Sequence, residues 1–177
     1  MTLERPDKGG HVPLDDDNLI GIGLAVVYES AAKSAAGGAL RALASLTFED
    51  WKRTEKQQFK VLLKKIKPCV DRLEDGELAS RFDDLEQALA DGHELRHIIV
   101  HVGWGEAGEG FLGYDYSREK EVTSADIQQA LNACAEIKRA CHWFALRVGE
   151  LVALGKLPDR GDGPGMSIKT QYGLAKL

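Results

Sequence analysis

The chain has little of several features that mark large classes of protein. Its 177 residues hold three cysteines, five prolines and 7% aromatic residues. An odd number of cysteines without a Cys-x-x-Cys pair excludes a disulfide framework. No apolar run approaches the roughly 20 residues that a membrane-spanning helix needs, and the N-terminus lacks the charged-then-apolar layout of a signal peptide. We therefore expect a cytoplasmic protein with no membrane partner.

An excess of positive charge is also missing. Acidic residues (28) outnumber basic ones (23), which gives a net charge of −5. The molecule as a whole would not be drawn to a polyanion, so binding of nucleic acid must use a local basic patch. The candidate is a run of cations three or four residues apart: Arg53, Lys56, Lys60, Lys64 and Lys67. Such a stripe is usually a solvated helix face; the alternative is an RNA phosphate strip formed by Arg53, Lys56, Lys60 and Lys64.

Helical periodicity dominates the first half of the chain. Three consecutive aspartates at 15–17 supply an N-cap and an acidic first turn for a helix over about 18–46. Its apolar residues recur at helical spacing: Leu19, Ile20, Leu24 and Val27. A second helix should begin near Thr47 and end before Pro68, because the residue before a proline disfavours helical geometry.

Two further helices are predicted. The first covers about residues 77–101, and Gly92 is a possible interruption. A segment rich in glycine and aromatic residues follows at 103–122 and is typical of a loop or short hairpin. Thr123 or Ser124 then caps the most regular helix of the chain, which Gly155 should stop.

This pattern predicts an all-α fold. We expect an up-and-down bundle of four to five helices, with a long loop or short hairpin before the last long helix. Residues 17–155 would form the helical domain. Residues 1–16 and 156–177 would be flexible tails.

Residues 93–101, HELRHIIVH, contain two catalytic patterns. The first is His-Glu-x-x-His, in which His93 and His97 share one helix face and could bind zinc while Glu94 polarises a bound water. His101 lies one turn further along and would be a third ligand. Zinc enzymes with this motif usually hold the substrate on a sheet edge, and no strand is predicted before His93.

The second pattern is Arg-x4-His, formed by Arg96 and His101 with His97 directly after the arginine. It lies late in a helix, a Val-Gly-Trp turn follows at 102–104, and a Thr/Ser-capped helix closes the domain. In these features residues 18–153 resemble the HEPN superfamily, a group of helical-bundle domains that includes many ribonucleases.

The resemblance implies metal-independent RNA cleavage without a cofactor. His101 would transfer protons, Arg96 would hold phosphate oxygens, and His97 would orient or tune its neighbours. It also implies a homodimer in which two motif copies line one cleft, and a cognate antitoxin or regulatory protein as a partner. Where some members have a tyrosine that the antitoxin modifies, this chain has Gly103, which argues against that route.

Two alternatives stay open beside the ribonuclease. One is a non-catalytic HEPN-like dimerisation or binding module, in which Arg96 and the histidines have structural roles. The other is the His-Glu-x-x-His zinc hydrolase, with His93, His97 and His101 as the ligands.

Overall fold

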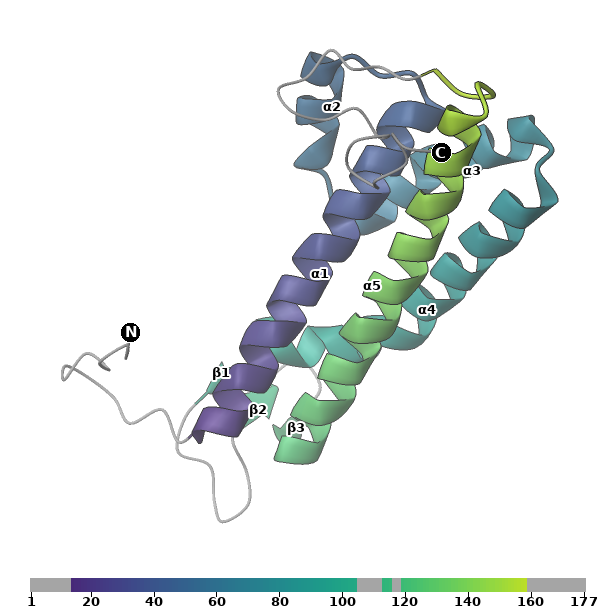
Figure 1. The fold of residues 1–177 in the computed structure, drawn as a ribbon. Coiled ribbons are helices and arrows are strands. Elements are labelled where there is room, and N and C mark those ends of the chain that lie inside the picture. Colours follow the sequence, from purple (N-terminus) through teal and green to yellow (C-terminus); the bar gives the residue numbers. More distant parts are fainter. Residues whose placement is uncertain (1–13, 105–112, 116–118, 159–177) are drawn as a thin grey trace.

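Five helices and one small sheet make up the described part of the chain, residues 14–104, 113–115 and 119–158 of a computed structural model. The helices are α1 (Asp16–Leu43), α2 (Phe48–Glu55), α3 (Phe59–Leu73), α4 (Gly76–His101) and α5 (Ser124–Ala153). Figure 1 shows three long helices side by side, with α5 between α1 and α4 and with α2 and α3 at one end. The all-α bundle predicted from the sequence is confirmed.

Side-chain caps fix where the long helices begin. Asp15 accepts a hydrogen bond from the backbone N–H of Asn18 at 2.8 Å, which confirms the cap predicted in the acidic run. Thr123 and Asp126 form a reciprocal capping box at the start of α5. At the other end of α5, Gly155 has a φ of 72°, a conformation that glycine adopts without strain, and the helix stops there as predicted.

The inner face of α1 is built from small residues. Ala25, Ala32 and Ala36 are at most 1% exposed, whereas Ile20 and Val27 are more than half exposed. The apolar spacing predicted the helix, but the bulky residues that carry it face outward. Small side chains allow the backbone of α1 to lie close to α5: a Cβ on Gly21 would stand 3.2 Å from Cγ2 of Ile127.

The helix predicted from Thr47 to Pro68 is two helices, and its end point was wrong. The chain breaks between α2 and α3 at residues 56–58, and α3 then continues through Pro68 to Leu73. An interior proline costs a helix about 3 kcal/mol. Here Cys69 and Val70, one and two residues later, are buried in the main core, which offsets that cost and carries the helix forward.

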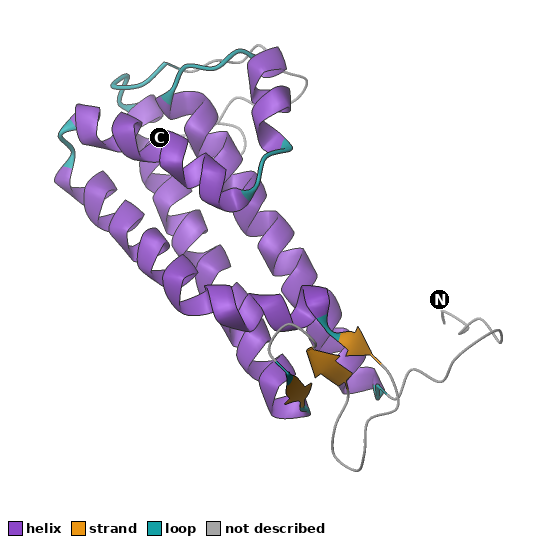
Figure 2. Cartoon of the chain, turned by 180° about the vertical axis from the view of Figure 1, so that it is seen from behind, coloured by secondary structure: helices purple, strands orange, loops and turns teal. Residues whose placement is uncertain are grey.

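The segment before α5, predicted as a loop or short hairpin, contains a three-stranded antiparallel sheet, one strand more than a hairpin has. Its strands are β1 (Gly103–Trp104), β2 (Gly113–Asp115) and β3 (Lys120–Val122), in that order. Gly103 pairs with Tyr114, and Tyr114 pairs with Glu121. Figure 2 shows the sheet at the end of the bundle opposite α2 and α3.

The main core fills the half of the bundle that contains α3. Phe82 of α4 and Phe144 of α5 are at most 1% exposed, and their ring centroids lie 5.6 Å apart. Two smaller clusters fill the half near the sheet. Leu14 and Leu157, which fall in the segments predicted as tails, are buried at the two ends of the helical domain. Residues 1–13 and 159–177 lie outside the described part.

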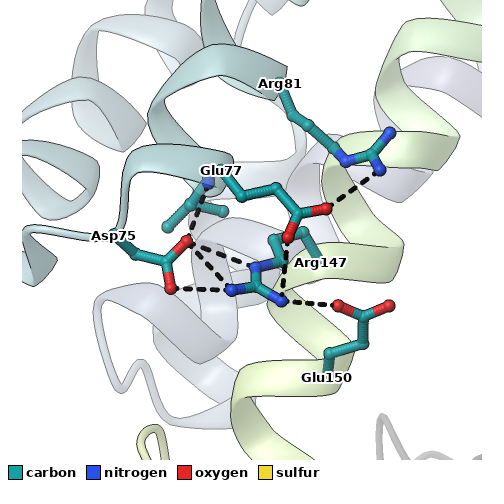
Figure 3. A network of polar contacts seen from close by, with 6 residues as sticks. Asp75, Glu77, Arg81, Arg147 and Glu150 are labelled. Atoms are coloured by element: carbon teal, nitrogen blue, oxygen red, sulfur yellow. Dashed lines mark hydrogen bonds and ion pairs between the residues drawn. The ribbon is translucent and has the colours of Figure 1, made fainter.

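An ion-pair network joins the start of α4 to the last turns of α5 (Figure 3). Arg147 donates hydrogen bonds to both carboxylate oxygens of Asp75, at 2.9 and 3.2 Å, while Asp75 also caps α4 through the N–H of Leu78. Arg147 contacts Glu77 and Glu150 as well, at 3.2 and 2.8 Å. The Arg147 guanidinium lowers the pKa of Asp75, and Asp75 raises the pKa of Arg147.

Among the described residues, α1 alone is long and apolar enough to cross a membrane by length and composition. In its most apolar stretch of 18 residues, 22% of the residues are buried. The core helix of a globular protein satisfies the same criteria, so this property by itself assigns no location.

Candidate functional site

The Arg-x4-His motif occupies the last six residues of α4, at the end of the bundle that carries the sheet. The side chains of His93, Arg96, His97 and His101 lie outside the described part of the structure. The helix runs through Gly92 without the interruption that was considered possible, and a Cβ on this residue would stand 2.8 Å from Cδ1 of Ile137 in α5.

Buried residues on both sides of the motif fix its position in the fold. Val102, directly after His101, is 8% exposed and packs in a cluster with Leu14, Val122 and Ile127. Leu95, directly before Arg96, packs against the same cluster and against the one that contains Ala25 of α1. The backbone of the motif is therefore anchored at both ends, next to the first turns of α1 and α5.

A polar contact joins those two helix starts. The amide of Asn18 donates to the capping carboxylate of Asp15 at 2.8 Å and to the hydroxyl of Ser124 at 3.2 Å. Asn18 is 7% exposed, so this buried amide keeps its donors paired across α1 and α5. The motif thus lies in a part of the bundle whose surroundings are fixed by both apolar and polar contacts.

Asp115 is a residue that the sequence analysis missed. It lies in β2, is 1% exposed, and belongs to the sheet that begins two residues after His101. Buried carboxylates are uncommon and need polar partners. Its sequence signal is weak, because the burial of an aspartate in a glycine-rich hairpin depends on how the sheet packs on the helices.

The predicted basic stripe lies far from the motif. Arg53 belongs to α2, Lys56 follows its last residue, and Lys60 and Lys64 belong to α3, so the four cations do not share one continuous helix. The core residues of α3 pack with Leu40 of α1, whereas the motif segment packs beside Ile22. Leu40 and Ile22 are 18 residues apart in α1, which corresponds to about 27 Å along the helix, so the basic stripe and the motif lie at opposite ends of the bundle.

A groove between α4 and α5 lies closer to the motif and has a volume of about 440 Å³. Its lining residues are Arg81, Asp84, Ala88, Glu136, Arg139, Ala140 and Trp143. Trp143 is 48% exposed, and the guanidinium of Arg81 lies 5.2 Å from the centre of its ring. Ala88 precedes Arg96 by eight residues, about 12 Å along α4. The groove therefore gathers an aromatic ring, two guanidinium groups and two carboxylates between α4 and α5, on the part of α4 that precedes the motif.

The described residues contain no group of three His, Cys, Asp or Glu side chains that could hold a metal ion. The side chains of the zinc hypothesis, His93, His97 and His101, lie outside the described part. All three cysteines are buried and none forms a disulfide, in keeping with their use as small apolar side chains. Burial raises the pKa of the Cys141 thiol, which keeps it protonated and unreactive.

No protein-family model, no curated protein and no solved structure matches the chain. The resemblance to HEPN domains therefore rests on the motif, its place late in α4 and the Thr-capped helix that closes the domain; Gly103 and Trp104, expected to form a turn, are strand β1.

Proposed function

We propose that the chain is a metal-independent endoribonuclease of the HEPN type, which acts through a cleft shared by two copies. The observation that supports it is the place of the motif. Arg96 and His101 end a long helix at one end of an all-α bundle, and a short sheet and a capped final helix follow. The position of the motif late in α4 and the capped start of α5 are the features that support the proposal.

The chemistry follows from the two side chains. His101 withdraws the proton of a ribose 2′-hydroxyl, and the oxygen attacks the adjacent phosphorus. The bond to the 5′-oxygen breaks, that oxygen takes up a proton, and a 2′,3′-cyclic phosphate remains. Arg96 stabilises the charge on the phosphoryl oxygens, because a guanidinium stays charged and can donate to two oxygens at once.

Two copies complete the site in this proposal. Five residues advance a helix by about 500°, so Arg96 and His101 of one helix project in different directions. In a dimer, Arg96 of one copy and His101 of the other can face the same RNA phosphate across the cleft. The groove between α4 and α5 would guide single-stranded RNA toward it, with a base stacked on Trp143 and phosphates near Arg139.

The decisive experiment is an RNA cleavage assay on the full chain in the presence of EDTA. Arg96→Ala and His101→Ala should each reduce cleavage by at least about 100-fold, and the products should end in a 2′,3′-cyclic phosphate. Arg72→Ala and His142→Ala serve as matched controls, because both side chains are exposed and lie outside the motif. Cleavage that persists in Arg96→Ala and His101→Ala would contradict the proposal.

A non-catalytic dimerisation or binding module is the second candidate. The observation that favours it is the outer face of α1, which exposes bulky apolar residues as partner-binding surfaces do. A folded, dimeric chain that cleaves no RNA under any metal condition would support this candidate. The zinc hydrolase has less support, because within residues 14–92 only helices precede the motif and no strand is present to hold a substrate.

A further inference from the structure

The first half of α1 carries an unusual surface. The described residues include eight large apolar side chains that are exposed, and five of them lie within nine residues of this helix. They are Leu19, Ile20, Leu24, Val26 and Val27, with exposures of 39, 58, 38, 52 and 59%. The other three, Val61, Trp143 and Leu154, lie on different helices or at a helix end. A patch of this density is typical of a protein contact.

The patch is continuous and uncharged. No acidic or basic residue occurs from Asn18 to Tyr28. Ile20, Gly23 and Val27 project within about 60° of one another on a helix. Nothing lies within 4 Å of the position that a Cβ on Gly23 would occupy, so the helix backbone is open at the centre of the patch. Such an opening permits close approach by another helix.

We propose that this outer face of α1 binds the same face of a second copy, with the two helices antiparallel about a twofold axis between Gly23 and Leu24. Ile20 then lies opposite the partner's Val27, and Gly23 opposite the partner's Leu24. The same register brings Lys33 within one helical turn of the partner's acidic residues 15–17. The apolar centres therefore face each other, and Lys33 offsets part of the acidic charge that Glu29 and the partner's residues 15–17 bring to each end of the contact.

The proposed contact also places the two motifs at one level. Ile22 of α1 packs against the same two clusters as Leu95, the residue before Arg96. An axis beside Ile22 therefore holds the two copies of residues 96–101 at matching heights along the dimer. The dimer itself does not require RNA cleavage. Because α5 lies between α1 and α4, equal height does not by itself bring the two motifs into one cleft, and the shared cleft rests on the proposed function alone.

A membrane surface fits this face less well. Helices that lie in a membrane interface carry lysine and arginine around their apolar face. By contrast, three aspartates stand at the start of α1, and Lys33 is the only lysine or arginine in residues 18–34. The opposite face of the helix is already packed against α5, and Asn18 is hydrogen-bonded to Ser124. A second copy would bury the apolar patch and bring its Lys33 close to acidic residues 15–17.

The first test measures the mass of the full chain by sedimentation equilibrium up to about 100 µM. One helix pair buries less than the roughly 800 Å² per partner of a standard interface, so we expect a dimer with a micromolar dissociation constant. The double variant Ile20→Glu/Val27→Glu should be monomeric, because each glutamate faces another across the axis. The control Val61→Glu/Leu154→Glu should remain dimeric. A wild-type chain that stays monomeric would overturn the proposal.

The second test fixes the register. Gly23→Cys should form a disulfide-linked dimer on mild oxidation, whereas Leu154→Cys should not. The native cysteines are buried and will not contribute to the cross-link. Equal cross-linking of both variants contradicts the proposed axis. Flotation of the wild-type chain, but not of Ile20→Glu/Val27→Glu, with vesicles of phosphatidylcholine and phosphatidylglycerol would assign the face to lipid instead. A dimer that fails to cleave RNA would leave this contact standing and remove the ribonuclease.

Discussion

Gly92 of α4 lies directly against Ile137 of α5. A Cβ on Gly92 would stand 2.8 Å from Cδ1 of Ile137 and 3.4 Å from Cβ of Ala133. Ile137 is 1% exposed, so its side chain has little room to move away. This contact sets the spacing of the two helices one turn before Arg96, and it explains why glycine stands inside a helix that it would otherwise weaken.

We predict that Gly92→Ala destabilises the protein by about 1 kcal/mol. Helix propensity would favour alanine by about 1 kcal/mol, but overpacking a filled site costs about 1–3 kcal/mol. Chemical denaturation monitored by circular dichroism gives the free energy of unfolding. In the double variant Gly92→Ala/Ile137→Val, removal of Cδ1 makes room for the new methyl group, so the combined loss should be smaller than the sum of the single losses.

Gly23→Ala is the matched control, since Gly23 lies in the interior of α1 with open space around it. At low protein concentration this change should stabilise the monomer by up to about 1 kcal/mol. If Gly92→Ala is equally stabilising, the close approach of α4 and α5 is not a constraint on the fold.

The pairing of Asp75 with Arg147 should make stability depend on pH. The side chains are 12 and 18% exposed, so solvent screens them only partly. Because the pKa of Asp75 is lowered in the folded chain, its contribution is complete above the usual aspartate pKa. The contribution falls as the pH drops below that value and is gone below the lowered pKa. The raised pKa of Arg147 has no effect near neutrality.

Asp75→Asn isolates the charge, since asparagine still caps α4. We expect a loss of about 1–2 kcal/mol at pH 7 that shrinks toward pH 3. Thermal unfolding at a series of pH values measures it. Arg139→Ala, which breaks an exposed pair with Glu136, should cost less than about 0.5 kcal/mol. A loss in Asp75→Asn that does not change with pH would show that capping geometry, not charge, is responsible.

The sequence predicts those features of the fold that depend on contacts between residues close together in the chain. Asp15, Thr123 and Gly155 mark helix ends by contacts within one turn. The sequence located these ends to within a few residues: the cap of α1 lies in the predicted run 15–17, that of α5 is the first of the two candidates Thr123 and Ser124, and Gly155 was predicted outright. Pro68 also gives a local signal, but packing of the residues after it reverses the outcome. The break at residues 56–58 has neither glycine nor proline, so no local rule predicted it.

The sequence did not predict which face of α1 is buried. Apolar periodicity identifies the stripe of Leu19, Ile20, Leu24 and Val27, which normally faces the core. In this chain the alanines on the opposite side are buried against α5, because small residues permit closer packing. In the same way, Arg81 of α4 and Trp143 of α5, which are 62 residues apart in the chain, lie in contact, and no short motif predicts such a contact.

Metal removal separates the two chemistries that share residues 93–101. If the ribonuclease proposal holds, EDTA treatment leaves RNA cleavage unchanged, and His93→Ala retains at least about one third of the activity. If zinc is bound, mass spectrometry under native conditions will detect about one metal ion per chain, which His93→Ala will lose. Activity that disappears with EDTA and returns with zinc would remove the metal-independent mechanism.

The path of the RNA can be tested by comparing the α4–α5 groove with the basic stripe on α2 and α3. The groove has two cations and two acids, so stacking on Trp143 should contribute more than net charge. We predict that Trp143→Ala weakens binding of a 2′-O-methyl RNA by about tenfold, in keeping with roughly 1–3 kcal/mol per stacked base. The double variant Lys60→Ala/Lys64→Ala should change binding less than twofold, since those side chains lie at the far end of the bundle. Fluorescence anisotropy at several salt concentrations provides both values. A large, salt-dependent loss in the lysine variant, with Trp143→Ala unchanged, would instead place the RNA along the stripe.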